Sequence, residues 1–236
     1  QTTVVLYNAG GSDENVDVSI EVFNADVNTG NIKSEFSSDL TGTSASLSGT
    51  TQNLLTIKSD STKVWRTNIT VNNPLLWSPK NPNLYIMKVK LEQGGNIIDE
   101  YYTQFGIRTV HTNVDKVYLN NNPVFFTGLA RHEDHPIFGR SIPVDSIYSD
   151  MLKVKDMNAL MLRTAHYPNH LYTYQLADRL GIAIVEEIPV WWFDNALAWI
   201  IQNNARHIHE HAQAQKHMLG AQLDIKFKSL ACTVQL

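Results

Sequence analysis

Two short apolar segments, each ending in a cluster of polar side chains, constrain the fold of this chain most strongly. The first lies in residues 128–136 (GLARHEDHP) and the second in residues 160–170 (LMLRTAHYPNH), and a helix-like stretch follows each of them. In a (β/α) barrel, strands that carry polar groups at their carboxyl ends and lead into helices build the active site. The pattern therefore predicts parallel β/α units with a binding or catalytic cleft at the strand ends.

The hydrophobic period changes near residue 110. Before that point, residues 16–22 and 85–91 alternate between apolar and polar side chains, as half-buried strands do, and Gly94-Gly95 indicates a turn. Several short strands separated by turn signals favour a β-sandwich, to which we assign residues 1–110. Further strands are predicted over residues 3–7, 54–58, 64–71 and 101–110.

Beyond residue 110 the pattern alternates between strands and helices. We predict a hairpin over residues 118–126, a helix that Asp145 caps, and a helix over residues 171–180 that Gly181 ends. This order predicts parallel β/α units in residues 111–236. About three units are visible where a closed barrel needs eight, so the predicted barrel is incomplete. Buried strands are predicted over residues 124–128, 159–163 and 182–185, and a third helix over about residues 197–217.

Composition excludes several classes of protein. The 236 residues are 43% apolar with a net charge of −4 and no basic run, which argues against disorder and against a nucleic-acid partner. No run of ~18 apolar residues is present, so we expect no membrane span, and the opening at Gln1 does not resemble a signal peptide. The single Cys232 excludes an internal disulfide and a cysteine zinc site. The sequence is compatible with a cytoplasmic, a periplasmic or a secreted protein, and with a homo-oligomer.

Several motifs, in a fixed order, resemble glycoside hydrolase family 2, the family of β-galactosidases, β-glucuronidases and β-mannosidases. The resemblance covers residues 1 to 211, and residues 212–236 do not align with the family. It implies an immunoglobulin-like β-sandwich followed by the first part of a TIM barrel. The motifs are residues 73–79 (NPLLWSP), 82–85 (PNLY), 105–110 (FGIRTV), 119–126 (LNNNPVFF), 131–136 (RHEDHP), 163–170 (RTAHYPNH) and 178–181 (DRLG), with Glu186-Glu187 after them.

The same resemblance implies a reaction. Family 2 enzymes hydrolyse terminal β-linked hexosides with retention, using two glutamates held about 5–5.5 Å apart. In the family, the acid/base belongs to an Asn-Glu pair after the fourth barrel strand, and the nucleophile follows the seventh strand. The sequence contains no Asn-Glu dipeptide and no seventh strand. We therefore predict that both catalytic glutamates are absent and that the 236-residue chain alone does not hydrolyse glycosides.

The resemblance implies sugar contact for three polar residues at the strand ends. His132 and His166 end neighbouring predicted strands, and neutral imidazoles donate hydrogen bonds to sugar hydroxyls. Arg163 also ends a strand, where its guanidinium would hold a catalytic carboxylate ionised. The alternative for Arg163 is a structural ion pair with Glu133 or Glu187.

Two further residues complete the predicted sugar site. Asn169, followed by His170, resembles the β-galactosidase form of this loop and favours galactose. Trp191, next to Trp192, would stack on a sugar ring, and packing in the core is the alternative. The Glu-x-His pair that binds magnesium in the galactosidases is replaced here by residues 190–193 (VWWF), so no metal or other cofactor is expected.

The family gives the carboxylates at the strand ends a supporting role. These are Glu133, Asp134 and Glu187, with Glu186 beside them. Strand-end carboxylates often serve as hubs of hydrogen bonds, which favours this interpretation. An independent catalytic pair among them is the alternative.

The predicted function is that of a β-galactosidase-like family 2 glycosidase whose ligand is a β-glycoside. The first alternative is a β-glucuronidase or β-mannosidase of the same family. The alternatives from another class are a non-catalytic carbohydrate-binding module and a truncated, inactive product that associates through exposed strand edges.

Overall fold

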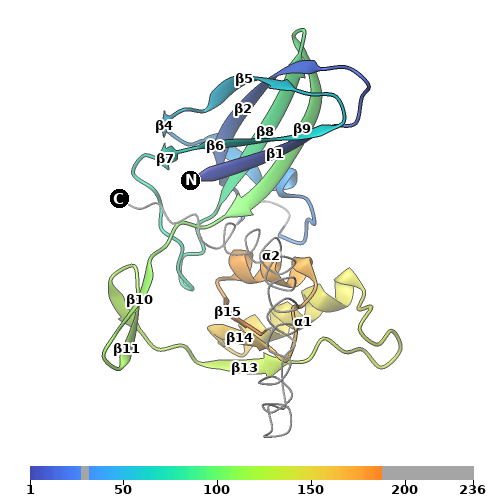
Figure 1. Ribbon diagram of the computed structural model, residues 1–236. Coiled ribbons are helices and arrows are strands. Elements are labelled where there is room, and N and C mark those ends of the chain that lie inside the picture. Colours follow the sequence, from blue (N-terminus) through green and yellow to red (C-terminus); the bar gives the residue numbers. More distant parts are fainter. Residues whose placement is uncertain (28–31, 188–236) are drawn as a thin grey trace, which may run out of the picture.

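The structure is a computed structural model that describes residues 1–27 and 32–187. Antiparallel strands form a β-sandwich at the top of Figure 1, and a parallel sheet with two helices lies below it. A small antiparallel sheet, built from the chain that links these two parts, lies to the side. The architecture is thus a β-sandwich followed by three parallel strands with helical connections, which is the arrangement expected for an immunoglobulin-like domain and the start of a TIM barrel.

The larger sheet of the sandwich has the order β3-β2-β8-β9, and β5 also pairs with β2. β1 pairs with β6 and β4 with β7, and all of these described pairs are antiparallel. A short 3-10 helix precedes β3 and covers residues Ser37–Leu40. The strands are β1 (Thr2–Asn8), β2 (Glu14–Ala25), β3 (Thr41–Ser44), β4 (Leu47–Gly49), β5 (Gln52–Ile57), β6 (Ser61–Thr67), β7 (Ile69–Val71), β8 (Tyr85–Gln93) and β9 (Asn96–Phe105).

The core of the sandwich follows the alternation of the sequence. Every second residue of β2 from Val16 to Val22 is at most 3% exposed and packs in one cluster with Leu6 of β1 and Trp65 of β6. The predicted strands over residues 16–22 and 85–91 are therefore confirmed, as is the turn at Gly94-Gly95 between β8 and β9. Burial of apolar surface in such a core is the main stabilising contribution to a sandwich of this size.

Two predicted strands are divided in the structure. The strand predicted over residues 64–71 is split at Asn68, because β6 pairs with β1 whereas β7 pairs with β4. The strand predicted over residues 101–110 ends at Phe105. There the chain leaves the ladder to contact Trp77, whose backbone N–H donates to the Ile107 carbonyl at 2.8 Å.

The second half of the chain contains the hairpin and the parallel strands that the sequence predicts. β11 (Lys116–Leu119) and β12 (Asn122–Val124) form the hairpin, and β10 (Val110–Asn113) extends it to three strands. The parallel sheet has the order β13-β14-β15, and its connections are helical. Its elements are β13 (Gly128–Arg131), α1 (Val144–Asp156), β14 (Met161–Thr164), α2 (Leu171–Leu180) and β15 (Ala183–Glu186). The helix predicted over residues 197–217 lies outside the described residues.

The first parallel strand begins later than predicted. Val124 ends β12, so the buried strand predicted over residues 124–128 is wrong, and β13 starts only at Gly128. Pairing begins at this residue because it has no side chain: a Cβ there would lie 2.3 Å from the Met161 carbonyl oxygen. β13 is also less buried than predicted, since Ala130 is exposed.

The helix termini agree with the sequence at one of two positions. Asp145 does not cap α1, because the N-cap is Pro143, whose carbonyl accepts from the backbone N–H groups of Ser146 and Ile147. Asp145 lies in the first turn instead and forms an ion pair with Lys33. α2 has the predicted bounds, and Gly181 ends it in the left-handed conformation with φ 73°.

A buried polar cluster joins the sandwich to α2. Trp77 Nε1 donates to the Asp178 carbonyl at 2.8 Å, and Gln104 Nε2 donates to Asp178 Oδ2 at 3.3 Å. The Gln104 Oε1 atom accepts from Arg179 Nε at 2.8 Å. Burial raises the pKa of Asp178 to about 6, and the charge of Arg108 opposes that shift. These contacts fix α2, and with it the parallel strands, against the sandwich.

Candidate active site

The polar clusters that follow β13 and β14 lie next to each other at the carboxyl edge of the parallel sheet. Arg131 of β13 pairs with Thr164 of β14, and Thr164 pairs with Glu186 of β15, so these three strands end side by side. His132 follows β13 directly, and His166 lies in the loop after β14. The topology therefore brings the two predicted clusters to one edge, as expected for parallel β/α units.

The two histidines are in contact. The ring centroids of His132 and His166 lie 5.1 Å apart with the planes at 73°, which is an edge-to-face arrangement. His132 is exposed and His166 is half-buried. Two imidazoles thus lie together at one edge of the sheet.

Arg163, His166 and Glu187 form a second contact at the same edge. Arg163 Nε donates to Glu187 Oε1 at 2.6 Å, and His166 Nδ1 lies 3.0 Å from Glu187 Oε2. The Arg163 guanidinium, followed by His166, holds the pKa of the Glu187 carboxyl below its usual range. Of the two carboxylates considered as partners of Arg163, Glu187 is the one in contact. His166 Nδ1 also lies 3.2 Å from Arg163 Nη2, so whether this atom donates to Glu187 or accepts from Arg163 depends on the tautomer of the ring.

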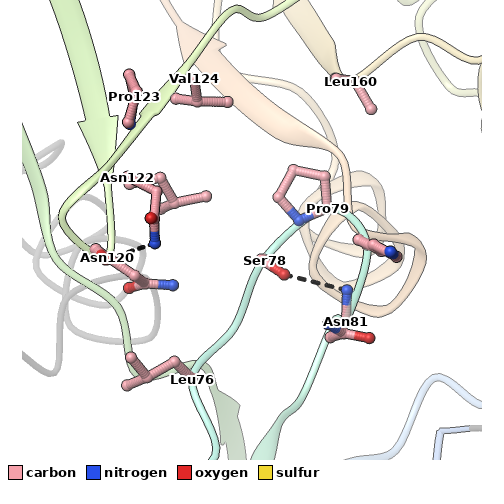
Figure 2. A pocket seen from close by; sticks show the side chains of 11 residues that line it. Leu76, Ser78, Pro79, Asn81, Asn120, Asn122, Pro123, Val124 and Leu160 are labelled. Carbon is pink, nitrogen blue, oxygen red and sulfur yellow. Dashed lines mark hydrogen bonds between the residues drawn. The ribbon is translucent and has the colours of Figure 1, made fainter.

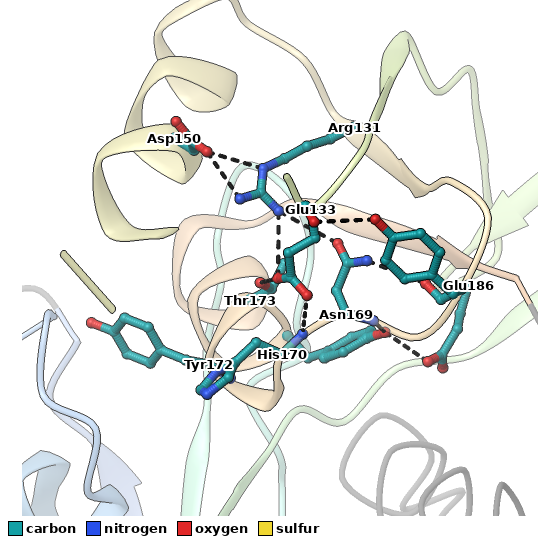
Figure 3. A network of polar contacts seen from close by, with 10 residues as sticks. Arg131, Glu133, Asp150, Asn169, His170, Tyr172, Thr173 and Glu186 are labelled. Carbon is teal, nitrogen blue, oxygen red and sulfur yellow. Dashed lines mark hydrogen bonds and ion pairs between the residues drawn. The ribbon is translucent and has the colours of Figure 1, made fainter. Parts of the chain in front are cut away.

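Glu133 joins the end of β13 to the start of α2 (Figure 3). Its Oε2 atom accepts from the backbone N–H of His170 at 2.8 Å, and its Oε1 atom accepts from Thr173 Oγ1 at 3.2 Å. Arg131 Nη1 lies 3.6 Å from the same Oε1 atom, and the Glu133 side chain is only 8% exposed. A buried carboxylate at the first turn of a helix satisfies amide groups that otherwise lack partners. These contacts favour a supporting role for Glu133 over a catalytic one.

The loop after β14 is held by several contacts within the protein. Asn169 is 6% exposed; its Nδ2 atom donates to the Tyr167 carbonyl at 3.2 Å, and its Oδ1 atom accepts from Arg131 Nη1 at 3.5 Å. The carboxamide of Asn169 therefore positions this loop, and its contact with a sugar stays a prediction. Asp134 is exposed on the loop after β13, and its supporting role also stays a prediction.

Some functional candidates lie outside the described residues. Trp191 and Trp192 fall in residues 188–236, so their predicted stacking on a sugar stays a prediction. Within residues 1–27 and 32–187, no group of three or more His, Cys, Asp or Glu side chains is arranged to hold a metal ion. None of the helices in those same ranges is long and apolar enough to span a membrane.

Sequence reasoning missed two contributors to this edge. Asp150 of α1 accepts from Arg131 Nη2 at 2.9 Å and from Arg131 Nε at 3.2 Å, which orients the guanidinium toward Glu133 (Figure 3). Tyr174 of α2 donates to Glu186 Oε1 at 2.6 Å and accepts from the Asn169 backbone N–H at 2.8 Å. The sequence pattern places Asp150 on a solvent-exposed helix face and Tyr174 on a buried one. It therefore does not indicate that either side chain contacts the strand ends.

A separate pocket of about 670 Å³ lies at the opposite end of the parallel strands (Figure 2). Leu160, which precedes β14, lines it together with the loop around Pro79 and the hairpin residues Asn120 and Asn122. Its polar groups already bond to one another, for example Asn122 Nδ2 to the Asn120 carbonyl at 3.0 Å. Because active sites of β/α barrels lie at the carboxyl ends of the strands, this pocket is not the candidate active site.

Two family models match consecutive parts of this chain. "Glycosyl hydrolases family 2" matches residues 1–108, and "Glycosyl hydrolases family 2, TIM barrel domain" matches residues 110–225. Together they cover the sandwich, the hairpin and the parallel strands. The two matched parts follow each other in the same order as the two parts of the structure.

Individual relatives of this chain are named as glycosidases. A β-galactosidase of Kluyveromyces lactis is 34% identical over 120 residues, which is 50% of this chain and 12% of that protein. The structure of β-glucuronidase 2 of Bacteroides uniformis, covalently bound to cyclophellitol-6-carboxylate aziridine, has a TM-score of 0.68 at 22% identity, over 80% of this chain and 21% of that one. A putative β-galactosidase of Bacteroides fragilis has a TM-score of 0.67 at 25% identity, over 79% of this chain and 25% of that one.

The chain therefore matches a quarter or less of the length of these three relatives. The two solved structures share the fold of this chain over 80% and 79% of its residues. The motifs around His132, Arg163 and His166 lie within the part that the barrel model matches. On these matches, the chain belongs to glycosyl hydrolase family 2.

Proposed function

We propose that this chain forms the sugar-facing edge of a retaining β-glycosidase that acts on terminal β-linked hexosides, with β-galactosides as the preferred substrates. The observation that carries the proposal is the contact between the rings of His132 and His166, 5.1 Å apart at the carboxyl edge of the parallel sheet. The loop residues Asn169 and His170 and the named activity of the Kluyveromyces lactis relative support galactose as the sugar.

Different hydrogen-bonding roles for the two imidazoles are part of the proposal. His166 contacts Glu187 Oε2 and Arg163 Nη2 through Nδ1, which hold its ring at the strand ends, where we propose that it contacts a sugar hydroxyl. His132 packs edge-to-face on this ring and donates or accepts according to its tautomer. Arg163, bound to Glu187, carries a positive charge beside the sugar, where it favours an ionised carboxylate. Its contact with a catalytic glutamate is part of the proposal.

Turnover by the chain itself is not part of the proposed function. Glu133, with both carboxylate oxygens engaged in α2, and Glu187, bound to Arg163 and His166, are committed to contacts within the protein. A retaining mechanism needs one carboxyl group free to move a proton and another free to attack carbon. We therefore assign neither the acid/base nor the nucleophile to Glu133 or Glu187, in line with the prediction that both catalytic glutamates are absent from this chain.

The test is a panel of chromogenic β-glycosides, namely the p-nitrophenyl galactoside, glucuronide and mannoside, with the purified 236-residue chain. The expected result is no turnover of any of them, together with binding of methyl β-galactoside by calorimetry. Turnover that co-purifies with homogeneous chain would contradict the assignment of the catalytic glutamates. Preference for methyl β-glucuronide or methyl β-mannoside would favour the first alternative, a β-glucuronidase or β-mannosidase. Binding of none of the three would contradict the proposed sugar site, although the chain would still have the fold of the family.

A further inference from the structure

The hydroxyl of Tyr174 occupies a branch point between two strand ends. It donates to Glu186 Oε1 at 2.6 Å and accepts from the backbone N–H of Asn169 at 2.8 Å. Glu186 is the last residue of β15, and Asn169 lies in the loop after β14. One side chain of α2 therefore holds both the end of one strand and the loop that follows its neighbour.

Each of these two anchored segments carries one member of the Glu187–His166 pair. His166 lies three residues before Asn169 in the loop, and Glu187 follows Glu186 directly. The His166 Nδ1 atom and the Glu187 Oε2 atom are 3.0 Å apart, so a shift of either segment by about 1 Å breaks their contact. Tyr174 thus links the two segments that carry these groups, in addition to the contacts that Arg163 makes with both.

The environment of Tyr174 keeps its hydroxyl in one state. The residue is 5% exposed, and burial, followed by the hydrogen bond to Glu186, raises the pKa of the phenol far above its usual value. The phenol therefore stays protonated at neutral pH, where it donates to Glu186. A fixed donor and acceptor in a buried site hold their partners more firmly than an exposed side chain does.

We propose that Tyr174 is a positioning residue of the sugar site: its hydroxyl sets the distance between His166 and Glu187 and so aims the His166 ring at the sugar. The role in sugar binding rests on the proposed function, whereas the role in joining the two residues does not. Tyr174 itself touches no substrate in this account.

The main test compares two tyrosines of the same helix. Tyr174→Phe removes the branch point, and Tyr172→Phe is the matched control, because Tyr172 is also buried in α2 but donates to the Lys33 carbonyl, away from the strand ends. The readout is the titration of the Glu187 carboxyl carbon by NMR in the 236-residue chain. In Tyr174→Phe, the Glu187 midpoint is expected to rise by about half a pH unit or more as the contact with His166 loosens. In Tyr172→Phe it is expected to stay at the wild-type value.

A second pair of variants keeps the test decisive if Tyr174→Phe fails to fold. Glu186→Gln and Glu186→Ala both remove the charge next to Glu187, but only glutamine keeps an oxygen that accepts from Tyr174. The difference between them therefore includes the loss of the hydrogen bond from Tyr174 at equal charge. The Glu187 midpoint is expected to be higher in Glu186→Ala than in Glu186→Gln.

The outcomes separate this inference from the proposed function. An unchanged Glu187 midpoint in Tyr174→Phe, or equal midpoints in the two Glu186 variants, overturns the positioning role whether or not the chain binds sugar. A raised midpoint with about tenfold weaker binding of methyl β-galactoside supports both. A raised midpoint in a chain that binds none of the three methyl β-glycosides supports the positioning role and contradicts the proposed function.

Discussion

Arg163 Nε and Glu187 Oε1 lie 2.6 Å apart, which joins the end of β14 to the residue that follows β15. The pair is only partly buried, with the two side chains 41% and 25% exposed. Because solvent screens an ion pair of this kind, the pair contributes little to the free energy of unfolding. Its main effect is on the geometry of the strand ends. Its consequence is that two neighbouring strands present their polar groups in one fixed arrangement.

Replacement of Arg163 by methionine should release Glu187. The pKa of Glu187 is lowered chiefly by the hydrogen bond from Arg163, so it should rise toward its ordinary value in Arg163→Met. A lowered pKa in the folded state stabilises the protein above the unfolded pKa of about 4.3, and that stabilisation is lost as the pH falls through the folded pKa. The wild type should therefore lose more stability than Arg163→Met between pH 7 and pH 3. Urea unfolding at the two pH values measures this, and Arg140→Met, which changes an arginine stacked on Tyr167 instead, is the control.

Asp178 should make the protein more stable under mildly acidic conditions. Its pKa is about 6 in the folded protein because of burial, against about 3.9 when unfolded. The folded state thus binds more protons between these values, and its stability should fall as the pH rises from 4 to 6, by an amount on the order of 3 kcal/mol. Asp178→Asn retains an acceptor for Gln104 and should show a flatter dependence across this window. Equal slopes in the two proteins would mean that Asp178 is ionised throughout.

The contact between Trp77 and Asp178 should couple the two halves of the molecule. Trp77→Phe loses the buried hydrogen bond to the Asp178 carbonyl and the stacking of Arg108 on the indole, and is expected to cost about 1–3 kcal/mol. Trp65→Phe is the control, because Trp65 is buried within the sandwich core. Unfolding followed separately by sandwich and α2 resonances should be one transition in the wild type and two in Trp77→Phe. If Trp65→Phe also unfolded in two transitions, the contact between Trp77 and Asp178 would not be what couples the two halves.

Gly181→Ala should destabilise the protein far more than the same change in a turn. Both Gly181 and Gly94 have positive φ angles, of 73° and 58°, so alanine costs about 1–2 kcal/mol at either site from backbone conformation alone. At Gly181 a Cβ would also lie 2.4 Å from the Pro79 carbonyl oxygen, whereas at Gly94 it meets nothing within 4 Å. Thermal unfolding of the two variants checks this, and equal losses would show that the close approach of Pro79 to α2 is wrong.

Local features of the fold were predictable from the sequence. The alternation in residues 16–22, the bounds of α2 and the left-handed Gly181 depend on side chains close together in the chain, and all are confirmed. The start of β13 was not predictable, because it depends on how closely Gly128 approaches Met161, a residue more than thirty positions away. The apolar run at residues 124–126 gave a strand signal that belongs partly to the hairpin instead.

The candidate site shows the same division. The sequence placed His132 and His166 at neighbouring strand ends, and the structure brings their rings together. It offered Glu133 and Glu187 equally as partners of Arg163, since spacing alone does not determine which loop folds back over a strand end. The hydrogen bonds of Tyr174 could not be predicted for another reason. A tyrosine on the buried face of a helix is expected to pack in the core, and the partners of its hydroxyl depend on where the loops lie in the folded protein.

The most direct test of the account is an NMR titration of the 236-residue chain with methyl β-galactoside, following the ring resonances of His132 and His166. We expect both rings to shift together along one saturable curve, and we expect His132→Ala to weaken binding while the sandwich resonances stay in place. Saturable binding that leaves both rings unmoved, or no binding of the galactoside, glucuronide or mannoside by a folded chain, would contradict the claim that these strand ends form a sugar site.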